Sequence, residues 1–383
     1  MNTLFYAPQM AAYGGMERHI CSLAALTARR GHRVTLLTTS NSLGEDLRAE
    51  IDHPSISLHE LPAARNQAGK VRKLQWLLSE VIKARRQSWD LIYTNGQSAL
   101  ARVVWHAANE SARRVHHHHT AADGGEQATW SNGFRQVLRD ATELVACSRA
   151  TRDAINHAVK RTNTVFLPYL TRCPVAAETV RDTEPRPALN FGFMGRLIGE
   201  KGIDAICRLS ADPSLAHVTW HLHGAGKNYP PEFFRAWPRI VYHGAYVGNA
   251  AQAAAFAQLD AVVLFSVHNE GMPLSLIEAM SAGLPWIATD RGGTRELAVS
   301  APNCVVVSHP ASDTDLRNAV IELGDRIRNG TTSRVAQREA YDRNFSPSVV
   351  GRRWMEFIEA HLPAPPAPSP AAAALLPASP SVP

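Results

Sequence analysis

Short apolar runs alternate with amphipathic stretches along most of the chain. The first run covers residues 3–8, and a glycine turn, a helical pattern over residues 16–30 and a second apolar run at residues 33–39 follow it. Further strands are expected at residues 57–61, 91–94, 114–118, 144–146 and 165–167. Because strands that alternate with helices form parallel sheets with helices on both faces, the pattern predicts an α/β fold.

The alternation restarts in the second half of the chain. Residues 173–187 are rich in proline and charge and are expected to form a linker. New strands are expected at residues 189–195, 220–226, 240–245, 261–265 and 286–289. Because 383 residues exceed one hydrophobic core, we expect one domain over residues 1–172 and a second over residues 188–345. A last helix within residues 346–362 is expected to return to the first domain, and the Pro- and Ala-rich residues 363–383 are expected to be disordered.

Residues 260–297 place two carboxylates eight positions apart around the start of one predicted helix. Glu270 follows the apolar run at residues 261–265, and Glu278 lies inside the helix, for which Pro273 fits the first position. A glutamate near a helix N-terminus is often only a favourable partner for the helix dipole, and that remains the alternative for Glu278 alone. Since ligands of open α/β sheets bind at the carboxyl ends of strands, this loop is a candidate site.

Two other loops follow strands in positions suited to phosphate binding. Gly195-Arg196 and Lys201-Gly202 lie between the first strand of the second half and a helix. This loop would bring backbone amides, a helix N-terminus and two cations to one place. A pyrophosphate group is bound by such an arrangement of hydrogen-bond donors and positive charge. In the first half, Gly14-Gly15 follows the first strand, and the alternative reading is a tight turn between strand and helix.

Four consecutive histidines, His116 to His119, end the strand predicted at residues 114–118. Successive side chains on a strand point to opposite faces, so at most two of the four can serve one site. An internal metal-binding tract is the alternative interpretation, but adjacent strand residues cannot easily converge on one ion, and no metal site is expected. Asp123 and Glu126 lie just beyond this tract.

Composition narrows the class of protein. A hydrophobic content of 45% with 19% charged residues is ordinary for a globular domain. The five cysteines are scattered without metal-ligand spacing, which argues against a disulfide framework or a zinc site and indicates a reducing cytosol. No apolar run approaches the roughly 18 residues of a membrane span, and residues 1–8 do not resemble a signal peptide. A soluble or peripheral cytoplasmic protein is therefore expected.

The formal net charge of +6 comes from the first half of the chain. The segment from Lys70 to Arg86, KVRKLQWLLSEVIKARR, combines basic residues with an apolar set at helical spacing, made of Val71, Leu74, Leu78, Val81 and Ile82. It can be a packed helix with a solvated basic side. It can also be a surface helix that meets anionic lipid through its cations and Trp76. Nucleic acid is not expected as a partner, because no recognisable binding module accompanies the charge.

The segment around the two glutamates resembles the E-x7-E segment of retaining glycosyltransferases of family 4. The resemblance rests on Ser266, Glu270-Gly271-Met272-Pro273, Glu278-Ala279-Met280, Gly283 and Gly292-Gly293. It covers about residues 1–360 and is strongest in the second half. It implies the GT-B fold, in which two Rossmann-like domains face each other across a cleft, with the acceptor on the first domain and the nucleotide-sugar donor on the second. One departure is Pro168-Tyr169, where the family usually has proline-asparagine-glycine.

The resemblance implies a role for each matched residue. Glu270 would hold the transferred sugar, Glu278 the ribose, and Arg196 with Lys201 the diphosphate, while the base would lie against backbone near Gly224 and Gly244. The implied catalytic residues are Glu270, His119, Arg196 and Lys201. The implied donor-binding residues are Gly15, Arg196, Lys201, Glu270, Gly271, Met272, Pro273, Leu274 and Glu278. Gly14, His117, Asp123 and Glu126 are secondary or acceptor candidates.

The implied reaction moves a hexosyl group from a nucleoside diphosphate sugar, such as a UDP-sugar, to a hydroxyl of a glycan or lipid-linked acceptor. The anomeric configuration is retained, and neither a cofactor nor a metal is expected, because Arg196 and Lys201 supply the positive charge. The expected context is cell-surface polysaccharide or glycolipid synthesis, in the cytoplasm or on the inner face of the membrane. The alternatives are a catalytically silent nucleotide-sugar-binding subunit and an epimerase or phosphorylase with the same fold.

Overall fold

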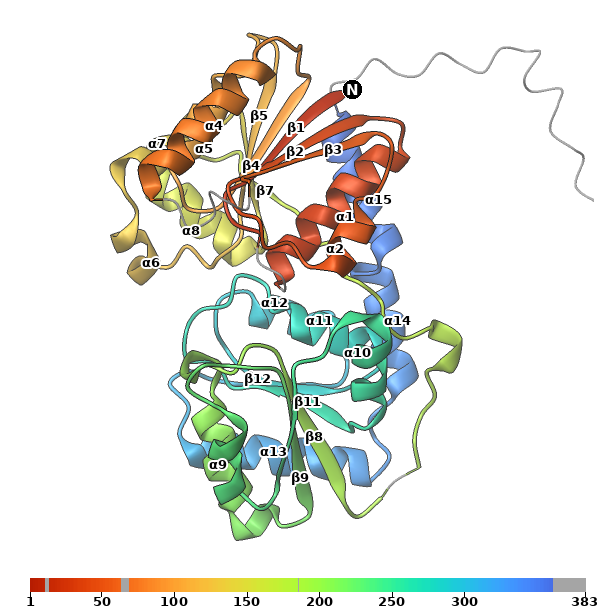
Figure 1. The fold of residues 1–383 in the computed structure, drawn as a ribbon. Helices are drawn as coiled ribbons and strands as arrows, with labels where there is room; N and C mark the ends of the chain where they lie inside the picture. Colours follow the sequence, from red (N-terminus) through yellow and green to blue (C-terminus); the bar gives the residue numbers. More distant parts are fainter. Residues whose placement is uncertain (11–13, 63–68, 185, 361–383) are drawn as a thin grey trace, which may run out of the picture.

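The computed structural model describes residues 1–10, 14–62, 69–184 and 186–360. Two parallel sheets, of seven and six strands, form the cores of two stacked α/β domains (Figure 1). The α/β, two-domain prediction is thus confirmed. The tail predicted at residues 363–383 lies outside the described residues. No helix of the described parts is long and apolar enough to cross a bilayer.

The first domain has the strand order β3-β2-β1-β4-β5-β6-β7. Its strands are β1 (Asn2–Ala7), β2 (Arg33–Thr38), β3 (Ile56–Glu60), β4 (Leu91–Asn95), β5 (Arg113–His118), β6 (Glu143–Ala146) and β7 (Val165–Phe166). Its helices are α1 (Gly15–Arg29), α2 (Glu45–Glu50), α4 (Lys70–Ala84), α5 (Leu100–Trp105), α6 (Gly124–Thr129), α7 (Asn132–Asp140) and α8 (Arg149–Val159). The order reverses between β1 and β4, and ligands of open α/β sheets bind at the carboxyl ends of strands at such a switch point.

The second domain has the order β10-β9-β8-β11-β12-β13. Its strands are β8 (Leu189–Met194), β9 (Val218–His223), β10 (Ile240–Gly244), β11 (Ala261–Leu264), β12 (Trp286–Thr289) and β13 (Cys304–Val307). Its helices are α9 (Ile203–Ala211), α10 (Gly248–Ala257), α11 (Leu274–Ser281), α12 (Thr294–Ala298), α13 (Asp313–Arg328) and α14 (Arg334–Asn344), with short 3-10 turns η1 (Ala177–Thr179), η2 (Gly199–Lys201), η3 (Pro213–Leu215) and η4 (Pro231–Ala236). Here the switch point lies between β8 and β11.

The last described helix, α15 (Pro347–Glu359), packs on the first domain although it follows the second in sequence (Figure 1). Trp354 is fully buried in the core of the first domain and donates a hydrogen bond from Nε1 to the Pro168 carbonyl, 2.7 Å away. Arg113 at the start of β5 pairs with Glu143 and also donates to the Ile358 carbonyl at the end of α15. The chain therefore crosses twice between the domains, at residues 167–188 and 345–346.

The structure differs from the predicted elements at three places. β13 was not predicted. Pro273 caps α11 instead of occupying its first position. In α4, Trp76, Leu77 and Val81 are buried, while Val71, Leu74, Leu78 and Ile82 are exposed. Of the predicted apolar set only Val81 faces the core, because the helix carries two apolar stripes and the other members of the set lie on the exposed one.

The segment predicted as a linker lies against the second domain. The Asp182 carboxylate accepts hydrogen bonds from the backbone N–H groups of Arg334 and Val335, which open α14. Val180 is buried, and its side chain lies close to Gly283 at the end of α11. These contacts join the connecting segment and α14 into one body with the second sheet.

Candidate active site between the two domains

Glu270 lies in the loop after β11, at the switch point of the second sheet. The loop is held by a short parallel bridge from Glu270 to Gly292, and a Cβ on Gly292 would lie 1.9 Å from the Glu270 carbonyl oxygen. The Glu270 side chain is 7% exposed and accepts a hydrogen bond from the Ser266 hydroxyl at 2.5 Å. Its carboxylate is thus fixed in orientation by the strand end that precedes it.

Lys201 donates to both carboxylate oxygens of Glu270, at 2.6 and 2.7 Å. It ends the turn η2, which follows β8 on the neighbouring side of the switch point. The next residue, Gly202, has φ +80°, and a Cβ there would lie 2.3 Å from the Phe265 carbonyl oxygen, so this close approach requires glycine. Arg196, earlier in the same loop, is exposed and makes no ion pair with another described residue.

Glu278 is buried in α11 and meets a cation from the other domain. Its Oε1 accepts a hydrogen bond from Arg18 of α1 at 2.7 Å, and its Oε2 accepts one from Gln252 of α10 at 2.7 Å. Burial raises the pKa of Glu278, while Arg18 and Gln252 act in the opposite direction. In this structure both carboxylate oxygens of Glu278 therefore have protein partners.

The glycine loop of the first domain approaches the same helix. Gly15 is the first residue of α1, and a Cβ on it would lie 2.2 Å from the Leu274 Cδ1 atom at the start of α11. Gly14 is just as crowded, since a Cβ there would lie 2.0 Å from the Glu17 carboxylate. Met272, between Glu270 and Leu274, is buried. The N-terminus of α1 thus packs directly against the donor loop predicted in the second domain.

The four histidines point alternately to the two faces of β5. His117 and His119 share one face, with ring centroids 4.0 Å apart, while His116 and His118 pack against Phe134 on the other. Burial lowers the pKa of His119 well below its ordinary value, and neighbouring histidines lower it further. His119 is therefore neutral at physiological pH, and its Nε2 has no hydrogen-bond partner among the described residues.

Tyr169 holds His119 in place. The two rings stack with centroids 5.5 Å apart, and the Tyr169 hydroxyl donates to the His119 carbonyl at 2.8 Å. Tyr169 stands where the resemblance expected asparagine. The residue that departs from the family pattern thus contacts a predicted site residue. From the sequence alone it was only a mismatch.

The two halves of the predicted site meet at Gly271. A Cβ on Gly271 would lie 2.7 Å from the His119 carbonyl oxygen and 2.8 Å from the Cys147 Sγ atom, so only glycine allows this approach of the domains. Glu296 of α12 adds a second contact, since its carboxylate accepts from the backbone N–H groups of Arg149 and Ala150. The loop of Glu270 therefore adjoins the end of β5.

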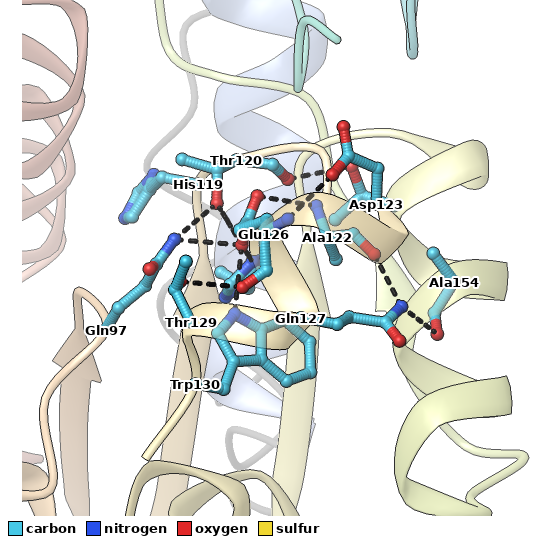
Figure 2. A network of polar contacts seen from close by, with 12 residues as sticks. Gln97, His119, Thr120, Ala122, Asp123, Glu126, Gln127, Thr129, Trp130 and Ala154 are labelled. Atoms are coloured by element: carbon cyan, nitrogen blue, oxygen red, sulfur yellow. Dashed lines mark hydrogen bonds and ion pairs between the residues drawn. The ribbon is translucent and has the colours of Figure 1, made fainter.

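Asp123 and Glu126 lie in a polar network beside the His119 loop (Figure 2). The Asp123 carboxylate accepts from the Glu126 backbone amide and from the Asn269 side chain of the second domain. The Glu126 carboxylate accepts from Gln97, Thr120 and the Ala122 amide, and it meets His118 Nε2 at 2.8 Å. Burial acts to raise the pKa of Glu126, but these hydrogen bonds lower it overall. Both carboxylates are engaged in holding the loop that carries residues 119–123.

Three residues at this interface were not among the predicted site residues. Arg18 and Asn269 bridge the domains to Glu278 and Asp123, and Gln252 reaches Glu278 from α10. Arg18 lies only three positions after Gly15, so the basic residue in the first turn of α1 was a local signal. Asn269 and Gln252 had no such signal, because their partners are distant in the sequence.

Comparison with known proteins places this geometry in a family. Residues 14–169 match a glycosyl transferase 4-like domain, and residues 188–326 match glycosyl transferases group 1. A GDP-mannose-dependent alpha-mannosyltransferase of Mycobacterium tuberculosis is 26% identical over 365 residues, 91% of each chain. A phosphatidyl-myo-inositol mannosyltransferase of Mycobacterium leprae is 24% identical over 90% of this chain and 93% of its own. The crystal structure of Anabaena HepE with UDP and glucose has a TM-score of 0.69 at 19% identity, covering 94% of this chain and 99% of that one.

Proposed function

The chain belongs to the glycosyltransferases that join a glycosyl transferase 4-like domain to a glycosyl transferases group 1 domain, and we propose that it is a retaining, metal-independent hexosyltransferase. The observation that supports this best is the meeting of Glu270, Lys201 and His119 where the carboxyl ends of the two sheets adjoin. A donor bound there would lie between both domains, which excludes water from the transferred sugar.

In the proposed complex the donor takes over contacts that the protein now makes with itself. The sugar hydroxyls bind Glu270, the diphosphate binds Lys201 and Arg196, and the ribose binds Glu278 once Arg18 has moved aside. The two cations stabilise the negative charge that develops on the leaving diphosphate, and this is why the proposed reaction does without a metal ion.

The neutral His119 presents Nε2 to the sugar as a hydrogen-bonding group without adding a charge. Positioning of both substrates supplies a large share of the rate enhancement in such a mechanism. The acceptor hydroxyl would attack from the face that the diphosphate leaves, with the phosphate oxygen taking its proton. The anomeric configuration of the transferred sugar is then retained.

For the donor we propose a nucleoside diphosphate hexose, with GDP-mannose the first to be tested because a relative that spans 91% of this chain is named for it. For the acceptor we propose a glycan or a lipid-linked hydroxyl at the cytoplasmic face of a membrane. A phosphatidyl-myo-inositol mannosyltransferase among the relatives and the basic first half of this chain support a lipid-linked acceptor.

A donor panel tests the proposed function. The purified chain would be incubated with radiolabelled GDP-mannose, UDP-glucose, UDP-galactose or UDP-N-acetylglucosamine, together with membrane extract as acceptor. We expect metal-independent transfer from one donor in the presence of EDTA, and an α-linked product by NMR. Binding without transfer to any acceptor would indicate a silent subunit. A changed sugar without an external acceptor would indicate an epimerase, and phosphate-dependent release of the sugar would indicate a phosphorylase.

We propose that the outer face of α4 docks on anionic lipid. Four apolar side chains follow one stripe of this helix, and two of them are widely exposed, Val71 at 69% and Ile82 at 60%. Lys70, Arg72, Lys83 and Arg85 lie along the same exposed side. Trp76 cannot take part as the sequence suggested, because it is buried with 6% exposure. An exposed apolar stripe beside cations is typical of helices that lie in the membrane interface.

Changing Val71, Leu78 and Ile82 together to Ser should abolish sedimentation with phosphatidylglycerol-containing vesicles while leaving the unfolding temperature nearly unchanged. The substitution removes apolar surface that faces solvent in the free protein, so folding loses little. Val299→Ser is the matched control, since Val299 is 87% exposed in the second domain. Binding of the natural chain should also weaken at high salt, as screening predicts. If the triple variant sediments as the natural chain does, α4 is not the docking surface.

A further inference from the structure

Three histidines gather on β9 and β10, the last two strands at one edge of the second sheet. His221 and His223 lie two positions apart on β9, so their side chains share one face. β10 is the outermost strand of the sheet, and its register against β9 shifts between Tyr242 and Gly244. His243 is the residue at this bulge, and bulges commonly redirect a side chain next to a site.

The ligand atoms of the three rings lie within 4.8 Å of one another. His221 Nδ1 and His243 Nε2 are 2.9 Å apart, and the rings of His223 and His243 stack with centroids 4.1 Å apart. Three nitrogens bound to one tetrahedral ion at about 2.0–2.1 Å are separated by roughly 3.3 Å. The rings stack with interplanar angles of 6° and 13°, so they must rotate out of this stack to point all three nitrogens at a common ion. Among the described residues, no other three His, Cys, Asp or Glu side chains come together in this way.

Two contacts around the cluster suit a bound ion. His223 is 5% exposed, and its Nε2 has no hydrogen-bond partner in the described part of the chain, although an unpaired buried nitrogen is costly. His221 meets the Asn190 side-chain oxygen with Nε2, at 3.3 Å, which leaves Nδ1 facing the cluster. Histidine ligands are usually oriented in this manner by a hydrogen bond from the other ring nitrogen. The exposed His243 leaves the fourth position open to water.

We propose that His221, His223 and His243 bind one divalent transition-metal ion, Zn²⁺ in the first instance, through three imidazole nitrogens and one water. The ion would take no part in the proposed transfer chemistry, although the cluster adjoins Gly224 and Gly244, where the base of the donor is expected. Two of its ligands, His223 and His243, immediately precede Gly224 and Gly244, so the ion would clamp the ends of β9 and β10 together and hold the two loops that leave the sheet there.

Titration of the metal-stripped, tag-free full chain with ZnCl2 tests this proposal. We expect one ion per chain by calorimetry, and an unfolding temperature that rises with ZnCl2, because an ion that binds only the native state stabilises it. Co²⁺ in place of Zn²⁺ should give the intense visible absorption of a tetrahedral site. His221→Gln, His223→Gln and His243→Gln should each weaken the affinity by at least ~100-fold, more than the loss of an outer hydrogen bond usually costs.

His157→Gln is the matched control, because His157 is an exposed histidine on α8 of the other domain. It should bind Zn²⁺ as the natural chain does. His243→Gln limits the effect on folding, since His243 is exposed and its replacement removes only its contacts with the rings of His221 and His223. Unchanged affinity in His243→Gln, or equal weakening in His157→Gln, would overturn the site and leave the three rings as a stacked structural ladder. Absence of binding to the natural chain would do the same.

Discussion

Glu270→Gln should lower the turnover number for hexosyl transfer by about 10²–10³-fold, the loss expected when one group that stabilises a transition state is removed. The amide keeps the shape of the carboxylate and can still accept a hydrogen bond from Ser266. It no longer neutralises Lys201, so the cation proposed to bind the diphosphate loses its fixed position. Turnover and the Michaelis constant would be measured with the donor found in the panel.

The matched variant is Glu278→Gln, the same change in another buried glutamate eight positions later. If Glu278 holds the ribose, its variant should raise the Michaelis constant for the donor more than it lowers turnover. Both variants should unfold within a few degrees of the natural chain, which excludes loss of structure as the cause. A Glu270→Gln chain that keeps more than about a tenth of the natural turnover would be inconsistent with the proposed role.

Acidification from pH 6.5 to 5 should destabilise the first domain by several kcal/mol. Burial lowers the pKa of His19 and of His116 to about 3, and His117 and His119 shift in the same direction. These rings stay neutral in the folded chain, whereas in the unfolded chain they take up protons near pH 6.5. Stability is therefore complete above pH 6.5 and falls toward the folded pKa, by ~2 kcal/mol at pH 5 for each of His19 and His116.

Urea unfolding followed by tryptophan fluorescence, at pH values from 7.5 to 5, measures this loss. Between pH 7.5 and 5 the change in the free energy of unfolding comes mainly from histidines, because most carboxylates of the unfolded chain titrate at lower pH. Glu278, whose pKa is raised by burial, acts in the opposite direction as the pH falls and reduces the loss slightly. His116→Gln should flatten the pH dependence, while the exposed His106→Gln should not. A free energy of unfolding that is flat between pH 6.5 and 5 would show that the buried rings are charged or accessible in the folded chain.

Local signals were sufficient to predict which loops lie at the carboxyl ends of the strands in each sheet. A strand that ends in a glycine-rich or charged loop can be recognised from a few neighbouring residues. Three such loops were found in this way, at Gly14-Gly15, Gly195 to Gly202 and Glu270. The alternation of His116 to His119 was predicted from strand geometry, and the structure settles which pair shares a face, His117 with His119.

Long-range packing could not be predicted in the same way. The partner of Glu278 is Arg18, 260 positions away, and no periodicity in the sequence links the two. The sequence left open whether the apolar set of α4 faces the core or a surface, because the helix offers two apolar stripes and which of them is buried depends on how the helix docks on the sheet. β13 (Cys304–Val307) was not predicted, although its run is as long as that of β12.

The position of α15 at the end of the chain determines the order in which the two domains can complete their cores during synthesis. Trp354 and its neighbours close the core of the first domain, yet the ribosome makes them after the whole second domain. The strands of the first domain emerge first but remain uncovered where α15 will lie. The second domain, from β8 to α14, is continuous in the chain and can complete its own core earlier. The half of the protein that is translated first is thus the half that finishes folding last.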